Sequence, residues 1–220
     1  MKQPRRILII GAAREHCFGI KKAQQMGLQV IAVDGNPDSE GFRITENHLL
    51  VSTYDHEAIL EGALKFIAKG NNIDGVMTLA SDVPYSVAYV AHHLGLPGIG
   101  LASAKNASEK ILMKDCFNIH SVPIPAYREV YSLEDLEEAK NDMGLPIIIK
   151  PVDSRGARGV QVIQNPDMLE SQYAHSLACS PQKRVMVEEY LAGPQLSTEG
   201  AMINGEVYIP AIFDRNYEYM

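Results

Sequence analysis

A lysine at the end of a β-branched run, followed by a loop of small and basic residues, constrains this chain more than any other feature. Residues 147–149 predict a buried strand, and residues 160–163 predict its hairpin partner. Between them, Gly156 and Gly159 permit positive φ and let backbone N–H groups approach an anion closely. Lys150 adds a positive charge that suits a phosphate oxygen. Spacing alone leaves a simple glycine-rich turn with an exposed lysine as the alternative.

A second apolar run leads into paired acids. Residues 184–187 predict a short strand, after which Glu188 and Glu189 lead toward a chain reversal at 193–194. A strand that leaves a buried run offers backbone groups at its end, and an adenine can pair with one C=O and one N–H two residues apart. The expected pair is the Glu189 C=O and the Leu191 N–H. Solvated acids at a strand end are the alternative interpretation.

These motifs, together with a Ser-Glu-Lys triplet upstream, resemble the ATP-grasp superfamily. That superfamily includes biotin carboxylase, the large chain of carbamoyl-phosphate synthetase, D-alanine ligase and several purine-pathway ligases. The matching pieces are residues 108–110 at the head of a predicted helix, 148–151 with the loop that follows, and 187–193. The loop is not a Walker A element, because no Gly-Lys-Ser or Gly-Lys-Thr triplet closes it before a helix.

The resemblance implies roles for particular residues. It implies that Lys110 and Lys150 contact the nucleotide phosphates, that the 154–159 loop closes over them, and that residues 188–191 form the adenine hinge. In the family an acid a few residues later binds the ribose hydroxyls, whereas this chain has Gln195, an amide without the carboxylate's charge. The expected nucleotide-binding residues are Lys110, Lys150, Ser154, Arg155, Gly156, Gly159, Glu188, Glu189, Tyr190, Leu191 and Gln195. Arg158 is a further candidate for a guanidinium contact, with surface exposure as its alternative.

The first hundred residues alternate between strand and helix patterns. A strand over 6–10, a turn over 11–19 that opens an amphipathic stretch, and a strand over 30–34 form a βαβ unit. Further strands are predicted near 48–51 and 75–78, and helices over 57–68 and 83–94. The expected fold class is α/β: an N-terminal doubly wound, Rossmann-like parallel sheet over residues 1–104, followed by a truncated α+β ATP-grasp domain over residues 105–220.

The first turn of that βαβ unit raises a rival function. A dinucleotide fingerprint requires glycines at positions 11, 13 and 16 and an acid that closes the second strand. The chain has Gly11, Ala13, His16 and Asp34, so only the first glycine and the acid match. An NAD-dependent dehydrogenase therefore stays as a minor alternative.

Ser81 and Asp82 follow the predicted strand at 75–78. Capping of the next helix is slightly favoured for them over a role in a substrate cleft at the carboxyl edge of the sheet. Downstream, a helix is predicted from about 108 to 118 and another over 133–143, which begins after Ser132 and ends at Gly144.

Composition narrows the class of protein. The chain has 220 residues, 46% of them hydrophobic, which is enough for a sizeable core and two domains. Its net charge of −7 argues against a nucleic-acid or anionic-membrane partner. No apolar run reaches membrane-helix length and no signal peptide is evident, so a cytoplasmic location is expected. The 3 cysteines are far apart and are expected to be free thiols.

The final segment predicts a hairpin at Asn204-Gly205. The family carries its magnesium ligands in a further part, so we expect an N-terminal fragment that is inactive or very slow alone. The expected intact enzyme uses ATP and Mg²⁺ to activate a carboxylate or bicarbonate as an acyl phosphate for attack by an amine or other nucleophile. A non-catalytic nucleotide-binding module is the main alternative. The expected partners are ATP and a small carboxylate-type substrate, with a homodimer as a further candidate.

Overall fold

The computed structural model describes residues 4–154 and 156–215. The N-terminal part of the chain forms a four-stranded parallel sheet. The strand order is β3-β2-β1-β4. The strands are β1 (Arg6–Ile10), β2 (Gln29–Asp34), β3 (Asn47–Leu50) and β4 (Gly75–Met77). The helices between and after them are α1 (Cys17–Gln25), α2 (His56–Ala68) and α3 (Pro84–His93), with short 3-10 turns η1 (Arg14–His16) and η2 (Glu40–Ile44).

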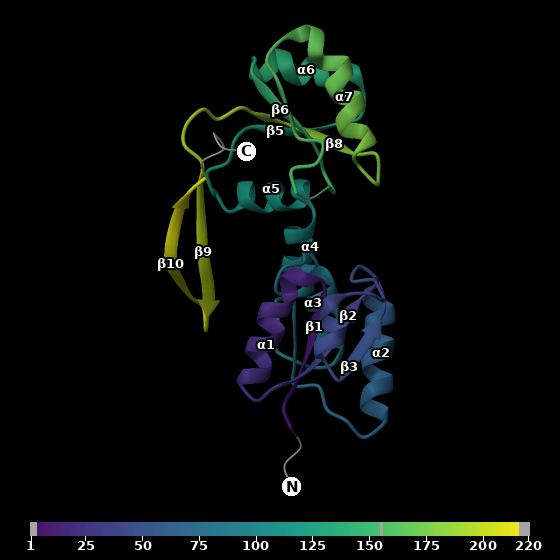
Figure 1. The fold of residues 1–220 in the computed structure, drawn as a ribbon. Helices are drawn as coiled ribbons and strands as arrows, with labels where there is room; N and C mark the ends of the chain where they lie inside the picture. Colours follow the sequence, from purple (N-terminus) through teal and green to yellow (C-terminus); the bar gives the residue numbers. More distant parts are fainter. Residues whose placement is uncertain (1–3, 155, 216–220) are drawn as a thin grey trace.

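Helices cover both faces of this sheet (Figure 1). Ile10 packs with Ile59 of α2 and Val90 of α3, whereas its neighbour Ile9 packs with Ile20 of α1 on the other face. Successive side chains of a strand point to opposite faces, so a strand covered on both sides is apolar throughout. The predicted doubly wound α/β sheet is confirmed.

The start of α3 differs from the prediction. Its N-cap is Val83, which makes no side-chain capping bond, and Pro84 occupies the first turn, where its missing N–H costs nothing. The Ser81 N–H instead donates to Thr78 Oγ1 over 3.3 Å, within a turn that precedes the helix. The predicted capping by Ser81 or Asp82 is therefore wrong, because Val83 occupies the cap position and no side chain in the described part of the chain caps the start of α3.

Two short helices lead from the parallel sheet to the rest of the chain (Figure 1). They are α4 (Leu101–Ser108) and α5 (Lys110–Ile119), joined at Glu109, whose backbone is extended. The helix expected from about residue 108 is α5, and α4 was not predicted. The expected domain boundary after residue 104 falls inside α4.

The second sheet is antiparallel, with the order β5-β8-β6-β7. Its strands are β5 (Tyr127–Val130), β6 (Ile147–Pro151), β7 (Gln161–Ile163) and β8 (Val185–Glu189). The helices α6 (Leu133–Met143) and α7 (Leu169–Ala178) belong to this unit, with a 3-10 turn η3 (Pro166–Met168) before α7. The predicted β6–β7 hairpin is confirmed, with Ile147 opposite Ile163. The predicted ends of α6 are also confirmed: Ser132 Oγ accepts from the Asp135 N–H, and Gly144 follows with φ of 76°.

The last elements are β9 (Leu196–Ile203) and β10 (Glu206–Asp214), an antiparallel hairpin that stands apart from both sheets (Figure 1). Asn204 and Gly205 have positive φ of 53° and 85°, as the predicted two-residue turn requires. Within residues 4–154 and 156–215, no helix is both long and apolar enough to cross a membrane.

Candidate functional site

The second sheet has one face covered by α6 and α7 and one face that carries charged side chains. Ile149 and Val187 belong to the core formed with the two helices. Their neighbours along the strands, Lys150 and Glu188, therefore point to the opposite face. Helix α5 approaches that face, since its Lys114 contacts Glu188.

Glu188 binds two lysines on this face. Lys150 Nζ donates to Glu188 Oε2 over 2.6 Å, and Lys114 Nζ lies 3.0 Å from Oε1. The second contact is an ion pair without hydrogen-bond geometry. The side chains of Glu188 and Lys114 are each 9% exposed, and that of Lys150 is 18% exposed. Charges this deeply buried require partners of opposite sign, which the cluster provides.

Lys110 binds the loop that follows β6. Its Nζ donates to the carbonyl oxygens of Val152, at 3.2 Å, and Ser154, at 2.6 Å. Lys150 lies in β6, and the carbonyl groups that Lys110 binds follow directly after that strand. The resemblance singled out both of these lysines. The loop is held against the start of α5.

The two glycines of this loop serve different needs. At Gly159, with φ of 75°, an added Cβ would lie 2.7 Å from Cys179 Cβ and 2.8 Å from Pro151 Cγ, so close packing requires glycine. At Gly156, with φ of 63°, nothing lies within 4 Å of an added Cβ, so only the backbone conformation favours glycine. The predicted site residue Arg155 lies outside the described residues.

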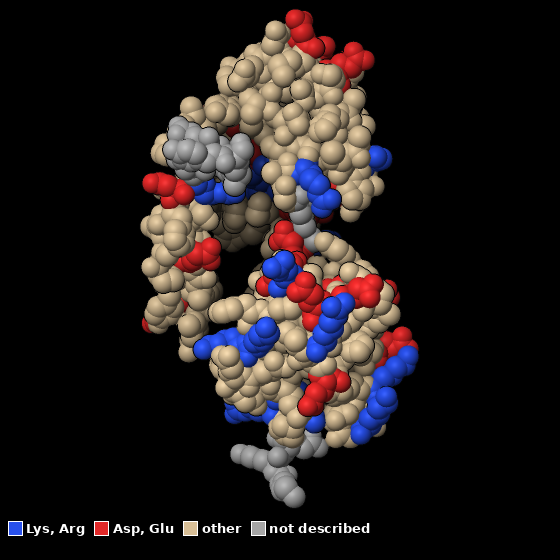
Figure 2. All heavy atoms as spheres, in the orientation of Figure 1, with Lys and Arg blue, Asp and Glu red and all other residues tan. Residues whose placement is uncertain are grey.

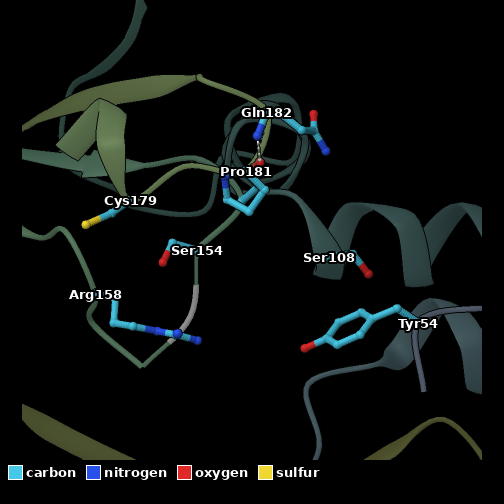
Figure 3. Close-up of a pocket in the computed structure, with 8 residues that line it drawn as sticks. Tyr54, Ser108, Ser154, Arg158, Cys179, Pro181 and Gln182 are labelled. Carbon is cyan, nitrogen blue, oxygen red and sulfur yellow. Dashed lines mark hydrogen bonds between the residues drawn. The ribbon is translucent and has the colours of Figure 1, made fainter. Parts of the chain in front are cut away.

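A cavity of about 720 Å³ lies between this loop and the N-terminal part of the chain. Figure 3 shows Arg158 and Tyr54 extending toward one another across it, from the loop after β6 and from the segment after β3. A second cavity of about 260 Å³ shares Ser108 and Ser154 with the first and also reaches Lys110. Figure 2 shows the same region as a hollow between the two halves of the molecule, with basic side chains at its edge.

Asp153 fixes the wall of the larger cavity. Its carboxylate accepts from the Ser180 hydroxyl, at 2.6 Å, and from the Gln182 N–H, at 2.8 Å, the bond drawn in Figure 3. Ser180 Oγ in turn accepts from the Arg184 N–H at 2.9 Å. This chain of bonds connects the loop after β6 to the start of β8.

The predicted hinge lies at the end of β8. The Glu189 N–H donates to the Ala126 carbonyl over 2.9 Å, and Glu189 Oε2 accepts from the Ala126 N–H over 3.3 Å. Tyr190 and Leu191 follow the strand and are 41% and 63% exposed. The Leu191 N–H has no hydrogen-bond partner among the described residues. Gln195 is exposed at the base of the β9–β10 hairpin, where its carbonyl accepts from the Arg215 N–H.

Two interactions of this region were not predicted from the sequence. One is the contact of Lys114, although its position one helical turn after Lys110 places both on one side of α5. The other is a clamp formed by Arg184, which binds Glu129 at 2.6 and 3.1 Å and Glu109 at 3.0 Å. The hydrogen bonds from Arg184 lower the pKa of Glu129 below its ordinary range. The pattern of residues around Arg184 does not indicate these partners, because Glu129 and Glu109 are distant from it in the sequence.

The first turn of the parallel sheet is already filled. His16 is buried, its Nε2 lies 3.1 Å from Ser81 Oγ, and an added Cβ at Gly11 would clash with that nitrogen. Asp34 accepts from the backbone N–H groups of Ala12, at 2.8 Å, and Asn36, at 2.9 Å. Each carboxylate oxygen of Asp34 thus accepts a backbone hydrogen bond. In the dehydrogenase alternative, the same carboxylate would bind the ribose of the dinucleotide.

Comparison with known proteins agrees with the fold and the order of the motifs. Residues 20–98 match the family model of the ATP-grasp N-terminal domain. Residues 109–199 match that of the carbamoyl-phosphate synthase L chain, ATP binding domain. The chain therefore belongs to the ATP-grasp superfamily.

Among curated proteins, the chain is 28% identical over 186 residues to alanine–anticapsin ligase of Bacillus subtilis, a match over 73% of this chain and 39% of that protein. It is 26% identical over 198 residues to the carbamoyl phosphate synthase large chain of Rubrobacter xylanophilus, over 84% of this chain and 18% of that one. An ADP complex of N5-carboxyaminoimidazole ribonucleotide synthetase has the same fold, with a TM-score of 0.81, 16% identity, and coverage of 99% of this chain and 55% of that one. The chain thus spans well under two thirds of each of these proteins.

Proposed function

We propose that this chain binds ATP on the charged face of the second sheet. The observation that carries the proposal is that Lys150 lies in β6 while Lys110 binds the glycine-containing loop that directly follows this strand. Two ammonium groups beside backbone that can approach an anion suit a triphosphate. The ligand-binding part then comprises residues 105–220, and residues 1–104 form the adjoining α/β domain.

Each group has a proposed task in nucleotide binding. Lys110 and Lys150 offset the charge of the phosphates, and the 154–159 loop, including Ser154, Gly156 and Gly159, excludes water. The segment from Glu188 to Leu191 holds the adenine through the Glu189 C=O and the Leu191 N–H. Gln195 is the proposed ribose contact. Arg155 is proposed on the resemblance alone.

The whole protein, we further propose, is a ligase that activates a carboxylate or bicarbonate as an acyl phosphate, which an amine or other nucleophile attacks. The names of the relatives support this, because alanine–anticapsin ligase and carbamoyl phosphate synthase are among them. Mg²⁺ accompanies ATP in such phosphoryl transfer. The described residues contain no group of three or more His, Cys, Asp or Glu side chains that could hold a metal ion. The free cysteines support the proposed cytoplasmic location.

Protection of the loop against trypsin tests ATP binding. Trypsin cleaves after arginine, and Arg155 and Arg158 lie in the loop, so bound ATP is expected to slow cleavage there. Lys150→Ala should abolish this protection, whereas Lys140→Ala, in α6 on the opposite face, should retain it. Protection that is unchanged in Lys150→Ala contradicts the proposed site.

A non-catalytic nucleotide-binding module is the second candidate. The amide of Gln195 favours it, since the family has an acid at that position and an amide lacks the negative charge. Such a module would bind ATP without magnesium-dependent phosphate release. Phosphate release measured with a panel of amino acids and carboxylates separates it from the ligase.

A further inference from the structure

Lys114 has no task in the proposed function, yet it is as buried as Glu188. Its side chain is 9% exposed, its Nζ lies 3.0 Å from Glu188 Oε1, and it lies 5.8 Å from the centre of the Tyr127 ring. Tyr127 offers no proton to this cluster, because its hydroxyl donates to Asp115 over 2.6 Å. Burial of a charged ammonium group costs free energy, so the position of Lys114 requires a compensating interaction or a function.

The cluster of Lys114, Lys150 and Glu188 contains two cations and one anion. Each carboxylate oxygen serves one ammonium group, Oε2 for Lys150 and Oε1 for Lys114. With all three groups ionised, the cluster has one net positive charge. Without Lys114, Glu188 and Lys150 would form a neutral pair beneath the proposed triphosphate.

We propose that Lys114 is a positioning residue for the nucleotide phosphates, acting through Glu188. It occupies one oxygen of the carboxylate, so that Glu188 orients the Lys150 ammonium without cancelling the positive charge of the site. This inference rests on the proposed function, and it assigns Glu188 a side-chain role separate from the backbone groups of the hinge. The competing explanation is a clamp that merely fixes α5 to the sheet.

Two substitutions distinguish these explanations by the sign of their effects. Lys114→Met keeps the length and the apolar stem but makes the cluster neutral, and Glu188→Gln keeps the shape but raises the net charge. Dissociation constants for ATP and adenosine, measured by calorimetry on the whole chain, give the preference for phosphates as a ratio. The inference predicts that Lys114→Met lowers the preference for ATP by about tenfold. Glu188→Gln should raise it.

A simple clamp predicts that both substitutions weaken ATP and adenosine binding together, and this result would overturn the inference. Lys114→Arg keeps the charge and should retain the preference of the wild type. It also keeps the test decisive if Lys114→Met unfolds, because loss of the preference in a folded Lys114→Arg chain contradicts the inference. The effect of Lys114→Met should shrink in concentrated salt. A wild-type chain that binds neither ATP nor adenosine overturns the proposed function itself, and the inference with it.

Discussion

The Lys110 ammonium lies 2.6 Å from the carbonyl oxygen of Ser154, and this bond attaches helix α5 to the loop that follows β6. The same nitrogen reaches the Val152 carbonyl at 3.2 Å. A lysine expected to bind phosphate therefore also holds the backbone of the loop expected to cover it. In this structure, the position of the loop therefore depends on the side chain that is proposed to bind phosphate.

Replacing that lysine should release the loop. In Lys110→Met, the backbone amides of residues 156–159 are expected to exchange with deuterium faster than in the wild type, because two charge-assisted hydrogen bonds are lost. Lys105→Met, in the exposed part of α4, is the matched control and should leave exchange unchanged. Equal exchange in both variants would show that the loop is held by other contacts.

Substitution by alanine should lower the free energy of unfolding by different amounts at the two loop glycines. Gly159→Ala is expected to destabilise the chain by about 3 kcal/mol, because a Cβ meets Cys179 and Pro151 and the φ is positive. Gly156→Ala should cost about 1 kcal/mol, since only the backbone conformation is strained. Urea unfolding measures both values. Similar costs at the two positions would contradict the packing role of Gly159.

The Arg184 clamp should contribute to stability in a pH-dependent way. Arg184→Met is expected to cost about 2 kcal/mol at pH 7, because it removes charged hydrogen bonds to Glu129 and Glu109. The pKa of Glu129 is lowered by those bonds, so this stability is present above the carboxyl's ordinary range, near pH 4, and disappears as the pH falls through the lowered pKa.

Urea unfolding of wild type and variant at pH 7 and at low pH tests this difference. Arg128→Met serves as the control, because Arg128 is 40% exposed and pairs with Asp142, which is 64% exposed. An exposed pair contributes at most about 1 kcal/mol. A loss in Arg184→Met that does not diminish at low pH would disprove the link to Glu129.

His16 should make the N-terminal sheet sensitive to mild acid. Burial lowers the pKa of His16 below the ordinary imidazole value, and the nearby Glu15 and Asp34 oppose this only in part. Protonation therefore favours the unfolded chain. The contribution of His16 is complete above about pH 6.5 and declines as the pH falls toward the lowered pKa.

The comparison is between wild type and His16→Gln, unfolded in urea at pH 7.5 and pH 5. The difference in their stabilities should shrink at the lower pH. His92→Gln, in the exposed part of α3, should leave the pH dependence of the wild type unchanged. A constant difference between wild type and His16→Gln would mean that His16 does not titrate in this range.

Hydrophobic periodicity, helix-capping residues and turn residues predicted much of the fold, because each of these signals depends only on residues close together in the sequence. The strand Arg6–Ile10, the helix Leu133–Met143 with its Ser132 cap, and the hairpin turn at Asn204 were all predicted from neighbouring residues alone. Local signals also misled at Ser81, where a turn built on the Thr78 hydroxyl competes with helix capping. Helix α4 lacks a polar cap residue and was missed, since Gly100 precedes it without a side-chain bond.

The charged cluster could be predicted only in part. Lys150 and Glu188 were singled out as site residues, but their mutual bond depends on the pairing of β6 with β8, which places Ile148 opposite Glu188. Lys114 and Arg184 find their partners through the packing of α5 and β5, and no spacing in the sequence encodes those contacts. Burial of these charged side chains is unfavourable unless a side chain of opposite charge lies beside them, so the packing determines which ion pairs form.

A crystal structure of the chain with a non-hydrolysable ATP analogue tests the central claim most directly. The account predicts that the phosphates lie within hydrogen-bond distance of the ammonium groups of Lys110 and Lys150. The adenine should pair with the Glu189 C=O and the Leu191 N–H. A nucleotide bound elsewhere, with both lysines still holding the partners described here, would contradict the account.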